Sequence, residues 1–258
     1  MLLNSAHILA DHAGRAVLPY FRRRIAVDNK GAGGAFDPVT RADRAAERVI
    51  LRAIATAWPD HGVIGEEFGA RRPAARLRWF IDPIDGTRAF IAGAPMWGIL
   101  IGLMDGEEPL LGVMDQPFTR ERFWSGPRSS HLRSAGGRSR RIRTRNRTRI
   151  GDAILMTTDP DLFTSGAESE AFGRAKAAAR LTRYGGDCYA YCLLACGFVD
   201  LVIEAGLKPH DVVALIPIIE RAGGCITTWD GGPASSGGRI VAAGDRRLHE
   251  AALKLLSR

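Results

Sequence analysis

The sequence has no apolar run long enough to span a membrane. Its first residues meet the acidic Asp11 early and lack the basic segment with which a signal peptide begins. It also has no internal repeat and no low-complexity linker. Hydrophobic residues make up 46% of the chain and charged residues 25%, which is ordinary for a globular protein. We therefore expect a cytoplasmic globular protein.

Cysteine is scarce, with four residues in 258, and no Cys-x-x-Cys pair is present. Cys188, Cys192 and Cys196 are spaced four residues apart, so they share one face of any helix there. Such a face can bind a metal, but the flanking Leu193 and Phe198 are typical of a core. The sequence therefore favours small buried cysteines over a metal cluster.

Positive charge is in excess and is concentrated in one stretch. The formal net charge is +8, and a basic patch of this kind can bind nucleic acid. No aromatic residue interleaves with the arginines, so stacking on bases is not supported. We favour a solvated hairpin anchored by Ile142 and Ile150, and an RNA-associated regulatory protein stays as an alternative of another class. The arginines concerned are Arg133, Arg138, Arg140, Arg141, Arg143, Arg145, Arg147 and Arg149.

The hydrophobic patterns change near residue 150. Residues 1–150 predict an α+β half with an antiparallel sheet and metal-binding motifs, and residues 151–258 predict an α/β half with a late metal ligand and substrate-pocket residues. We expect one compact body with a cleft between the halves. The first half is predicted to have helices at 2–24 and 40–58, a loop at 28–36, and strands at 63–64, 97–104, 110–114 and 122–124. The second half is predicted to have strands at 153–156, 181–184, 199–204, 225–228 and 240–243, and helices at 168–179, 189–197, 212–221 and 245–256.

The most informative segment runs from Trp79 to Thr87 and reads Trp-Phe-Ile-Asp-Pro-Ile-Asp-Gly-Thr. Its apolar start predicts a strand that delivers Asp82 and Asp85, and Pro83 should break the strand because it has no N–H group. Two carboxylates on one turn suit Mg²⁺, which binds one or two protein carboxylates together with phosphate oxygens. Gly86 lets a phosphate approach the backbone, where the N–H groups that open the next helix can bind it. The segment predicts a metal site beside a phosphate site.

Three further carboxylates give weaker signals. Glu66 follows a short predicted strand, where functional side chains are common, and becomes a candidate third metal ligand. Asp43 and Asp211 stand at predicted helix starts, where aspartate is commonly a cap. His210 precedes Asp211 and could bind a metal, although an isolated histidine is more often structural.

In this order, the motifs resemble the inositol-monophosphatase-like family of Mg²⁺-dependent phosphatases. The resemblance covers nearly the whole chain and implies a layered αβαβα sandwich, two or three Mg²⁺ ions, and a homodimer acting on a small phosphate monoester rather than on nucleic acid or at a membrane. One departure is His210, which stands where the family usually has Trp. The matching segments are Asp37-Pro38-Val39-Thr40-Arg41-Ala42-Asp43, Gly65-Glu66-Glu67, the run from Trp79 to Thr87, and Asp211.

The resemblance also implies roles for individual residues. Backbone N–H groups of Gly86 and Thr87 would hold the phosphate. Asp43 and the Thr87 hydroxyl would help Glu66 to activate a metal-bound water for direct in-line attack, with no serine or cysteine nucleophile. The implied metal ligands are Glu66, Asp82, the Ile84 carbonyl, Asp85 and Asp211.

Several features are similar to the histidinol-phosphate phosphatases of histidine synthesis. Arg88 follows Thr87 where inositol enzymes usually have Asn, and the segment 186–189 is similar to that branch. Histidinol phosphate carries a primary ammonium, which carboxylates at Asp187 and Glu204 could pair with. The predicted substrate-binding residues are therefore Asp187, Glu204 and Arg88, although Asp187 could instead cap a helix. An inositol-1-monophosphatase or a broad sugar-phosphate phosphatase is the alternative.

Overall fold

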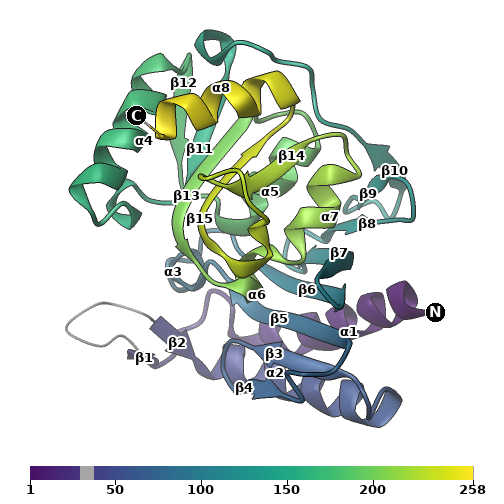
Figure 1. Cartoon of the computed structure of the whole chain (residues 1–258). Helices are drawn as coiled ribbons and strands as arrows, with labels where there is room; N and C mark the ends of the chain where they lie inside the picture. The colour runs from purple at the N-terminus through teal and green to yellow at the C-terminus, as the bar shows by residue number, and fades with distance from the viewer. Residues whose placement is uncertain (30–37, 258) are drawn as a thin grey trace.

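The computed structural model describes residues 1–29 and 38–257. Helices and sheets alternate in five layers, and Figure 1 shows the N-terminal helices at one side of the molecule and the C-terminal helix at the other. The layered α/β sandwich predicted from the sequence is confirmed. No helix in the described ranges is long and apolar enough to cross a membrane.

The first layer consists of α1 (Leu2–Val17) and α2 (Arg41–Ala57), which pack on each other and on one face of the larger sheet. Helix α1 ends earlier than predicted and continues as the short 3-10 helix η1 (Leu18–Tyr20). Pro19 accounts for the early end, because it cannot donate the next helical hydrogen bond. Helix α2 begins as predicted after Thr40, whose hydroxyl accepts the Ala42 N–H at 3.1 Å.

The second layer is an eight-stranded sheet in the order β10-β9-β8-β7-β6-β5-β3-β4. All its strands pair antiparallel except β3 with β5, which is parallel. Strand β4 is short and fully exposed, so it carries no alternating apolar pattern and the sequence did not predict it. The strands are β3 (Gly62–Gly65), β4 (Gly69–Arg71), β5 (Leu77–Asp85), β6 (Gly98–Asp105), β7 (Glu108–Gln116), β8 (Glu121–Ser125), β9 (Ser130–Arg133) and β10 (Ser139–Ile142).

Strand β5 corrects one expectation, because it does not end at Pro83. It pairs with β6 at Asp82 and again at Asp85, and the register shifts between these two positions. The irregularity places Pro83 outside the ladder, so its missing N–H costs no hydrogen bond and pairing resumes. The result is a bulge in β5 between Asp82 and Asp85, so both carboxylates come from the same strand.

The fourth layer is a five-stranded sheet in the order β12-β11-β13-β15-β14. Its first three strands are parallel and its last three are antiparallel. Helices α5, α6 and α7 form the third layer between the two sheets, while α4 and α8 pack together on the outside, with α8 against β15. The strands are β11 (Ile154–Thr157), β12 (Leu181–Tyr184), β13 (Leu201–Leu207), β14 (Cys225–Thr228) and β15 (Gly238–Ala243). The helices are α3 (Thr87–Ile91), α4 (Gly166–Ala178), α5 (Asp187–Ala195), α6 (Pro209–Val212), α7 (Leu215–Glu220), α8 (Arg246–Leu256), η2 (Ile150–Asp152), η3 (Pro160–Leu162) and η4 (Ala234–Ser236).

The single helix predicted at 212–221 is wrong, because the structure has two short helices, α6 and α7, in its place. Pro217 lies in the first turn of α7, where its missing N–H is tolerated. The same missing N–H cannot bond the carbonyl four residues earlier, at Val213, and the chain turns there.

The remaining local predictions have mixed outcomes. The arginine-rich stretch forms an antiparallel hairpin of β9 and β10 only as far as Ile142, which is buried. The arginines after Ile142 lie outside the hairpin, and Arg145 pairs with the buried Asp200. Cys188 and Cys192 are buried in the core between the sheets as free thiols. The predicted loop at 28–36 overlaps β1 (Val27–Asn29), which pairs with β2 (Pro38–Thr40). Residues 30–36 of that loop, together with Asp37, lie outside the described residues.

Candidate active site

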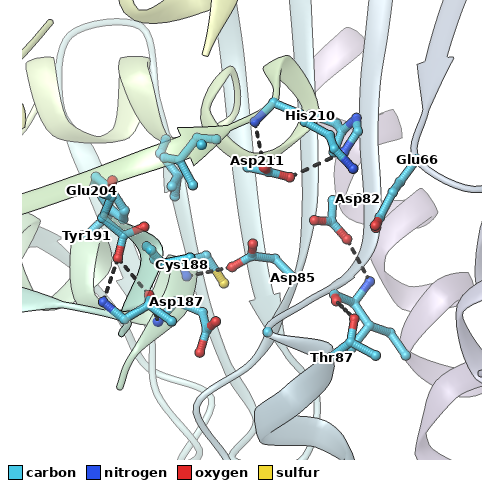
Figure 2. Close-up of a pocket in the computed structure, with 18 of the residues that line it drawn as sticks. Glu66, Asp82, Asp85, Thr87, Asp187, Cys188, Tyr191, Glu204, His210 and Asp211 are labelled. Carbon is cyan, nitrogen blue, oxygen red and sulfur yellow. Dashed lines mark hydrogen bonds and ion pairs between the residues drawn. The ribbon is translucent and has the colours of Figure 1, made fainter. Parts of the chain in front are cut away.

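A pocket of about 330 Å³ opens where the two sheets face each other. Its walls come from the end of β5 and the start of α3 on one side and from β13, α5 and α6 on the other. Figure 2 shows acidic side chains from both sides turned toward the same space. The pocket brings together ten of the residues predicted from the sequence as parts of the site: Glu66, Asp82, Ile84, Asp85, Gly86, Thr87, Arg88, Asp187, Glu204 and Asp211.

Three aspartates form the centre of the pocket. Carboxylate oxygens of Asp82, Asp85 and Asp211 all lie within 4.8 Å of one another. Asp82 accepts the Ile84 N–H at 3.0 Å, and Asp85 accepts the Cys188 N–H of α5 at 2.6 Å. Asp211 accepts the Lys208 N–H at 2.7 Å, as a residue of a helix start does. These backbone bonds fix one oxygen of each carboxylate, and the second oxygen of Asp211 lies 3.3 Å from the His210 Nε2.

The electrostatics of the three aspartates favour a cation. Burial raises the pKa of Asp82 well above its ordinary value, and the charges of Glu66, Asp85 and Asp211 raise it further. Burial raises the pKa of Asp85 in the same way, with Asp187 and Asp211 adding to the rise. Clustered anions in a poorly solvated place repel one another, and a divalent cation relieves that repulsion. Hard carboxylate oxygens at this spacing therefore fit a divalent metal ion.

Glu66 lies directly after β3 and reaches the pocket beside Asp82 (Figure 2). It is the strongest neighbouring charge that raises the pKa of Asp82. It stands outside the tight cluster of three aspartates. The structure thus places Glu66 at the edge of the cluster, where it can bind an ion or a water next to Asp82.

The turn between β5 and α3 is shaped by a glycine. Gly86 has φ of 87°, and a Cβ there would meet the Met96 carbonyl oxygen at 2.9 Å and the Asp187 side chain at 3.0 Å. A larger residue would therefore be strained and would clash. The Thr87 hydroxyl donates to the Ile84 carbonyl at 3.0 Å, which ties the first residue of α3 back to the carboxylate-bearing bulge.

Asp43 is the one predicted catalytic residue that does not line the pocket as described. It is buried in the first turn of α2, where Oδ2 accepts the Thr40 N–H at 2.8 Å and the Thr40 hydroxyl at 2.6 Å. This is the helix-capping arrangement that is the ordinary interpretation of an aspartate at a helix start. Oδ1 has no hydrogen-bond partner among the described residues, and burial raises the pKa of Asp43 to about 6.

Asp187 and Glu204 face the same pocket from the second half of the chain. Burial raises the pKa of Asp187 to about 6 and that of Glu204 to about 7. The N-cap of α5 is Gly186 and no side chain caps that helix, so the alternative role of Asp187 as a cap is not found. Asp187 has φ of 43°, which is uncommon for a residue other than glycine. Such backbone conformations are frequent at functional sites.

Two pocket residues were missed from the sequence. The Thr158 hydroxyl donates to Glu204 at 2.6 Å and accepts the Asp187 backbone N–H at 3.2 Å, so it holds the Glu204 carboxylate and the Asp187 backbone in place. The Tyr191 hydroxyl is buried and has no hydrogen-bond partner among the described residues. Neither residue stands in a recognisable motif, and only their places in the fold bring them to the pocket.

The cationic residues at the pocket are few. Arg88 on α3 lines the pocket and forms an ion pair with Asp159 at 3.8 Å, and its charge lowers the pKa of Asp187. The His210 Nε2 lies 3.3 Å from an oxygen of Asp211. His210 therefore contacts a member of the aspartate cluster.

Comparisons with known proteins agree with this architecture. The inositol monophosphatase family matches residues 2–258. A bifunctional phosphatase of Arabidopsis thaliana, IMPL2, chloroplastic, is 43% identical over 259 residues, which cover 96% of this chain and 72% of the relative. The histidinol-phosphatase of Mycobacterium tuberculosis is 33% identical over 222 residues, 85% of each chain.

A solved structure is also similar. An inositol monophosphatase from Zymomonas mobilis superposes with a TM-score of 0.87 at 39% identity, covering 99% of this chain and 97% of that one. Sequence and structure thus lead to the same family over the whole length of the chain. The chain belongs to the inositol monophosphatase family and is a phosphoric monoester hydrolase.

Proposed function

We propose that the protein is a Mg²⁺-dependent histidinol-phosphate phosphatase, which converts L-histidinol phosphate and water to L-histidinol and phosphate. The observation that carries this proposal is a pair of carboxylates in the same pocket as the aspartate cluster, the half-buried Asp187 and the buried Glu204. A substrate that carries a phosphate and an ammonium matches a pocket that has a metal site and, beside it, two further acids.

The distances support this arrangement. The side chain of Asp187 packs against Gly86, since a Cβ at Gly86 would lie 3.1 Å from the Asp187 Cβ. A phosphate held at Gly86 would therefore have the Asp187 carboxylate next to it, within reach of a short amino alcohol. Thr158 fixes the Asp187 backbone and the Glu204 carboxylate, so both acids are in place before a ligand binds.

Two or three Mg²⁺ ions would neutralise the phosphate and lower the pKa of water at this site. The chain supplies carboxylates that are already positioned by backbone hydrogen bonds, and backbone N–H groups at Gly86 and Thr87 to orient the phosphate. The proposed ligands are Glu66, Asp82, the Ile84 carbonyl, Asp85 and Asp211.

The proposed catalytic residues handle the proton of the attacking water. Glu66 would accept it at a carboxylate oxygen beside Asp82. The Thr87 hydroxyl, held by the Ile84 carbonyl, would orient that water. Asp43 can take part only through Oδ1, because Oδ2 is already bonded to Thr40.

Inositol-1-phosphate hydrolysis is a second candidate, favoured by the 39% identity with the inositol monophosphatase of Zymomonas mobilis. The two candidates share the metal site and differ in what Asp187 must bind. An inositol hydroxyl needs only a neutral partner, whereas an ammonium is bound best by a carboxylate.

The test compares phosphate release from L-histidinol phosphate and from inositol 1-phosphate, with Mg²⁺ and with EDTA. We expect release that requires Mg²⁺ and a higher kcat/KM for L-histidinol phosphate. A higher kcat/KM for inositol 1-phosphate would overturn the substrate proposal and leave the metal site standing.

A single variant sharpens the comparison. Asp187→Asn removes the charge but keeps the shape, so it should lower kcat/KM for L-histidinol phosphate by about 10- to 100-fold, the effect of losing one charge-assisted hydrogen bond. Inositol 1-phosphate serves as the matched control substrate, because its kcat/KM should fall much less. Equal losses with both substrates would contradict the assignment of Asp187 to the ammonium.

The homodimer implied by the resemblance is likewise a proposal. Light scattering on the 27.9 kDa chain tests it directly, because a dimer has twice that mass.

A further inference from the structure

The structure holds a buried glutamate that no step of the proposed reaction uses. Glu47 lies on α2, one turn after Asp43 and on the same face of the helix, and none of its surface is exposed. Its Oε2 accepts the Glu67 N–H at 2.7 Å and its Oε1 accepts the Phe68 N–H at 3.0 Å. Each carboxylate oxygen therefore holds one backbone group of the loop that follows β3.

The same loop is fixed on its other side by the strand that carries the aspartates. The Glu66 N–H donates to the Ile81 carbonyl at 3.2 Å, and Ile81 directly precedes Asp82. Three consecutive N–H groups are thus bonded, the first to β5 and the next two to Glu47. The backbone on both sides of the Glu66 side chain is pinned relative to Asp82.

Close packing leaves the carboxylate of Glu47 little freedom. A Cβ at Gly65 would lie 2.6 Å from Glu47 Cδ, so the carboxylate occupies the place that a side chain at position 65 would need. Gly65 is the last residue of β3 and the one before Glu66. Glycine at this position is what allows the carboxylate to lie directly beneath the loop.

The chemistry of this bond pair calls for a carboxylate. Placing a charge in a core is costly unless it is well hydrogen-bonded. The two hydrogen bonds to this carboxylate come from backbone N–H groups rather than from an arginine or a lysine. Glutamine at this position would offer one acceptor oxygen and would turn its NH₂ toward the second N–H. Only a carboxylate, or a near analogue, accepts both bonds.

We propose that Glu47 is a positioning residue, which holds the loop so that Glu66 is aimed at the aspartate cluster and thereby sets the affinity of the site for divalent metal ions. The inference rests on the proposed metal site. Glu47 touches neither substrate nor metal in this scheme and acts through Glu66 alone.

The test is the Glu47→Gln variant, with Mg²⁺ binding measured by isothermal titration calorimetry and the Mg²⁺ dependence of phosphate release measured beside it. We expect the Mg²⁺ dissociation constant and the half-activating Mg²⁺ concentration to rise about tenfold, since one charge-assisted bond is lost. At saturating Mg²⁺, kcat should return close to the wild-type value, because the ion restores the geometry. Gly65→Ala displaces the same carboxylate from the opposite side and should raise both quantities as well, which keeps the test valid if Glu47→Gln does not fold.

Asp200→Asn is the matched control. Asp200 is also fully buried and also accepts a backbone N–H, from Ile154 at 2.7 Å, but it pairs with Arg145 and does not line the pocket. It should lower the Tm without changing the Mg²⁺ dissociation constant. If Glu47→Gln and Gly65→Ala behave like Asp200→Asn, with a lower Tm and unchanged Mg²⁺ binding, the inference is overturned while the proposed function stands. Wild-type protein that binds no Mg²⁺ would overturn both together.

Discussion

Two groups of carboxylates in this protein have opposite electrostatic surroundings. On the outer side of the eight-stranded sheet, Asp115 lies 2.6 Å from the guanidinium of Arg122, which also binds Asp11 at 2.7 Å. Burial raises the pKa of Asp115, but Arg122 opposes the rise. In the pocket, by contrast, the neighbours that act on the pKa of Asp82 are other acids, and they add to the rise.

The difference shows what each group is for. For Asp115 the chain supplies its own cation, Arg122. In the pocket it leaves neutralisation to a cation from solution, and it accepts the repulsion of the empty cluster. We therefore expect the Arg122 group to affect mainly the free energy of unfolding and the pocket aspartates to affect mainly catalysis, which variants can test.

The largest effect is expected in the pocket. Asp85→Asn keeps an oxygen to accept the Cys188 N–H but removes a ligand charge, so kcat should fall by about 10³-fold or more. The Tm without metal should stay the same or rise, because one repelling charge is gone. Asp82→Asn should behave alike. Phosphate-release kinetics and calorimetry check both parts, and a near-normal kcat would remove these residues from the site.

The next effect is expected at the arginine-neutralised group. Arg122→Met leaves Asp115 buried without its cation, which should lower the free energy of unfolding by about 3 to 5 kcal/mol. The kcat of the folded variant should be nearly unchanged.

Urea unfolding measures this loss, with Arg44→Met as the control. Arg44 pairs with Asp28 at the surface, so its removal should cost less than about 1 kcal/mol. Similar losses in the two variants would mean that burial of the Arg122 pair has no energetic consequence.

The smallest effect concerns pH. The pKa values of Asp187 and Glu204 are raised to about 6 and about 7, from ordinary values of 3.8 and 4.5. At pH values between the ordinary and the raised pKa of each group, the folded protein binds more protons than the unfolded chain. These two groups therefore make the free energy of unfolding in EDTA fall as the pH rises from about 4 to 7. Mg²⁺ needs deprotonated ligands, so it should raise the Tm by a few degrees more at pH 8 than at pH 5.

Differential scanning calorimetry with Mg²⁺ and with EDTA at each pH gives this comparison. His7, whose pKa burial lowers to about 4, has the opposite pH dependence, but it contributes equally with and without Mg²⁺ and cancels in the difference. The same Mg²⁺ shift at both pH values would contradict the prediction.

Much of the fold was predictable because it depends on local patterns. Leu181–Tyr184 and Cys225–Thr228 are strands with the predicted bounds, and the run from Trp79 to Thr87 marks the strand and turn of the pocket. Prolines misled in both directions. Pro83 was expected to end a strand that continues through a bulge, and the single helix predicted at 212–221 did not allow for Pro217, where the structure has two short helices.

What the sequence could not give is the pairing of distant groups. The Thr158 hydroxyl between Asp187 and Glu204 depends on how β11 and β13 pair, which no local pattern encodes. The burial of Glu47 could not be predicted from the sequence for another reason. A glutamate in a helix is expected on the solvated face, and only the packing of α2 beneath the Glu66 loop reveals that it is buried.

The bond from Cys188 to Asp85 joins residues 103 positions apart in the chain. Closing so long a loop is slow and entropically unfavourable until both sheets have formed and met. Translation must therefore pass α5 before Asp85 gains its partner there, and Asp211, the third aspartate of the cluster, comes later still. The pocket therefore forms only late in folding, since an incomplete chain carries the motif of β5 without the walls of the pocket.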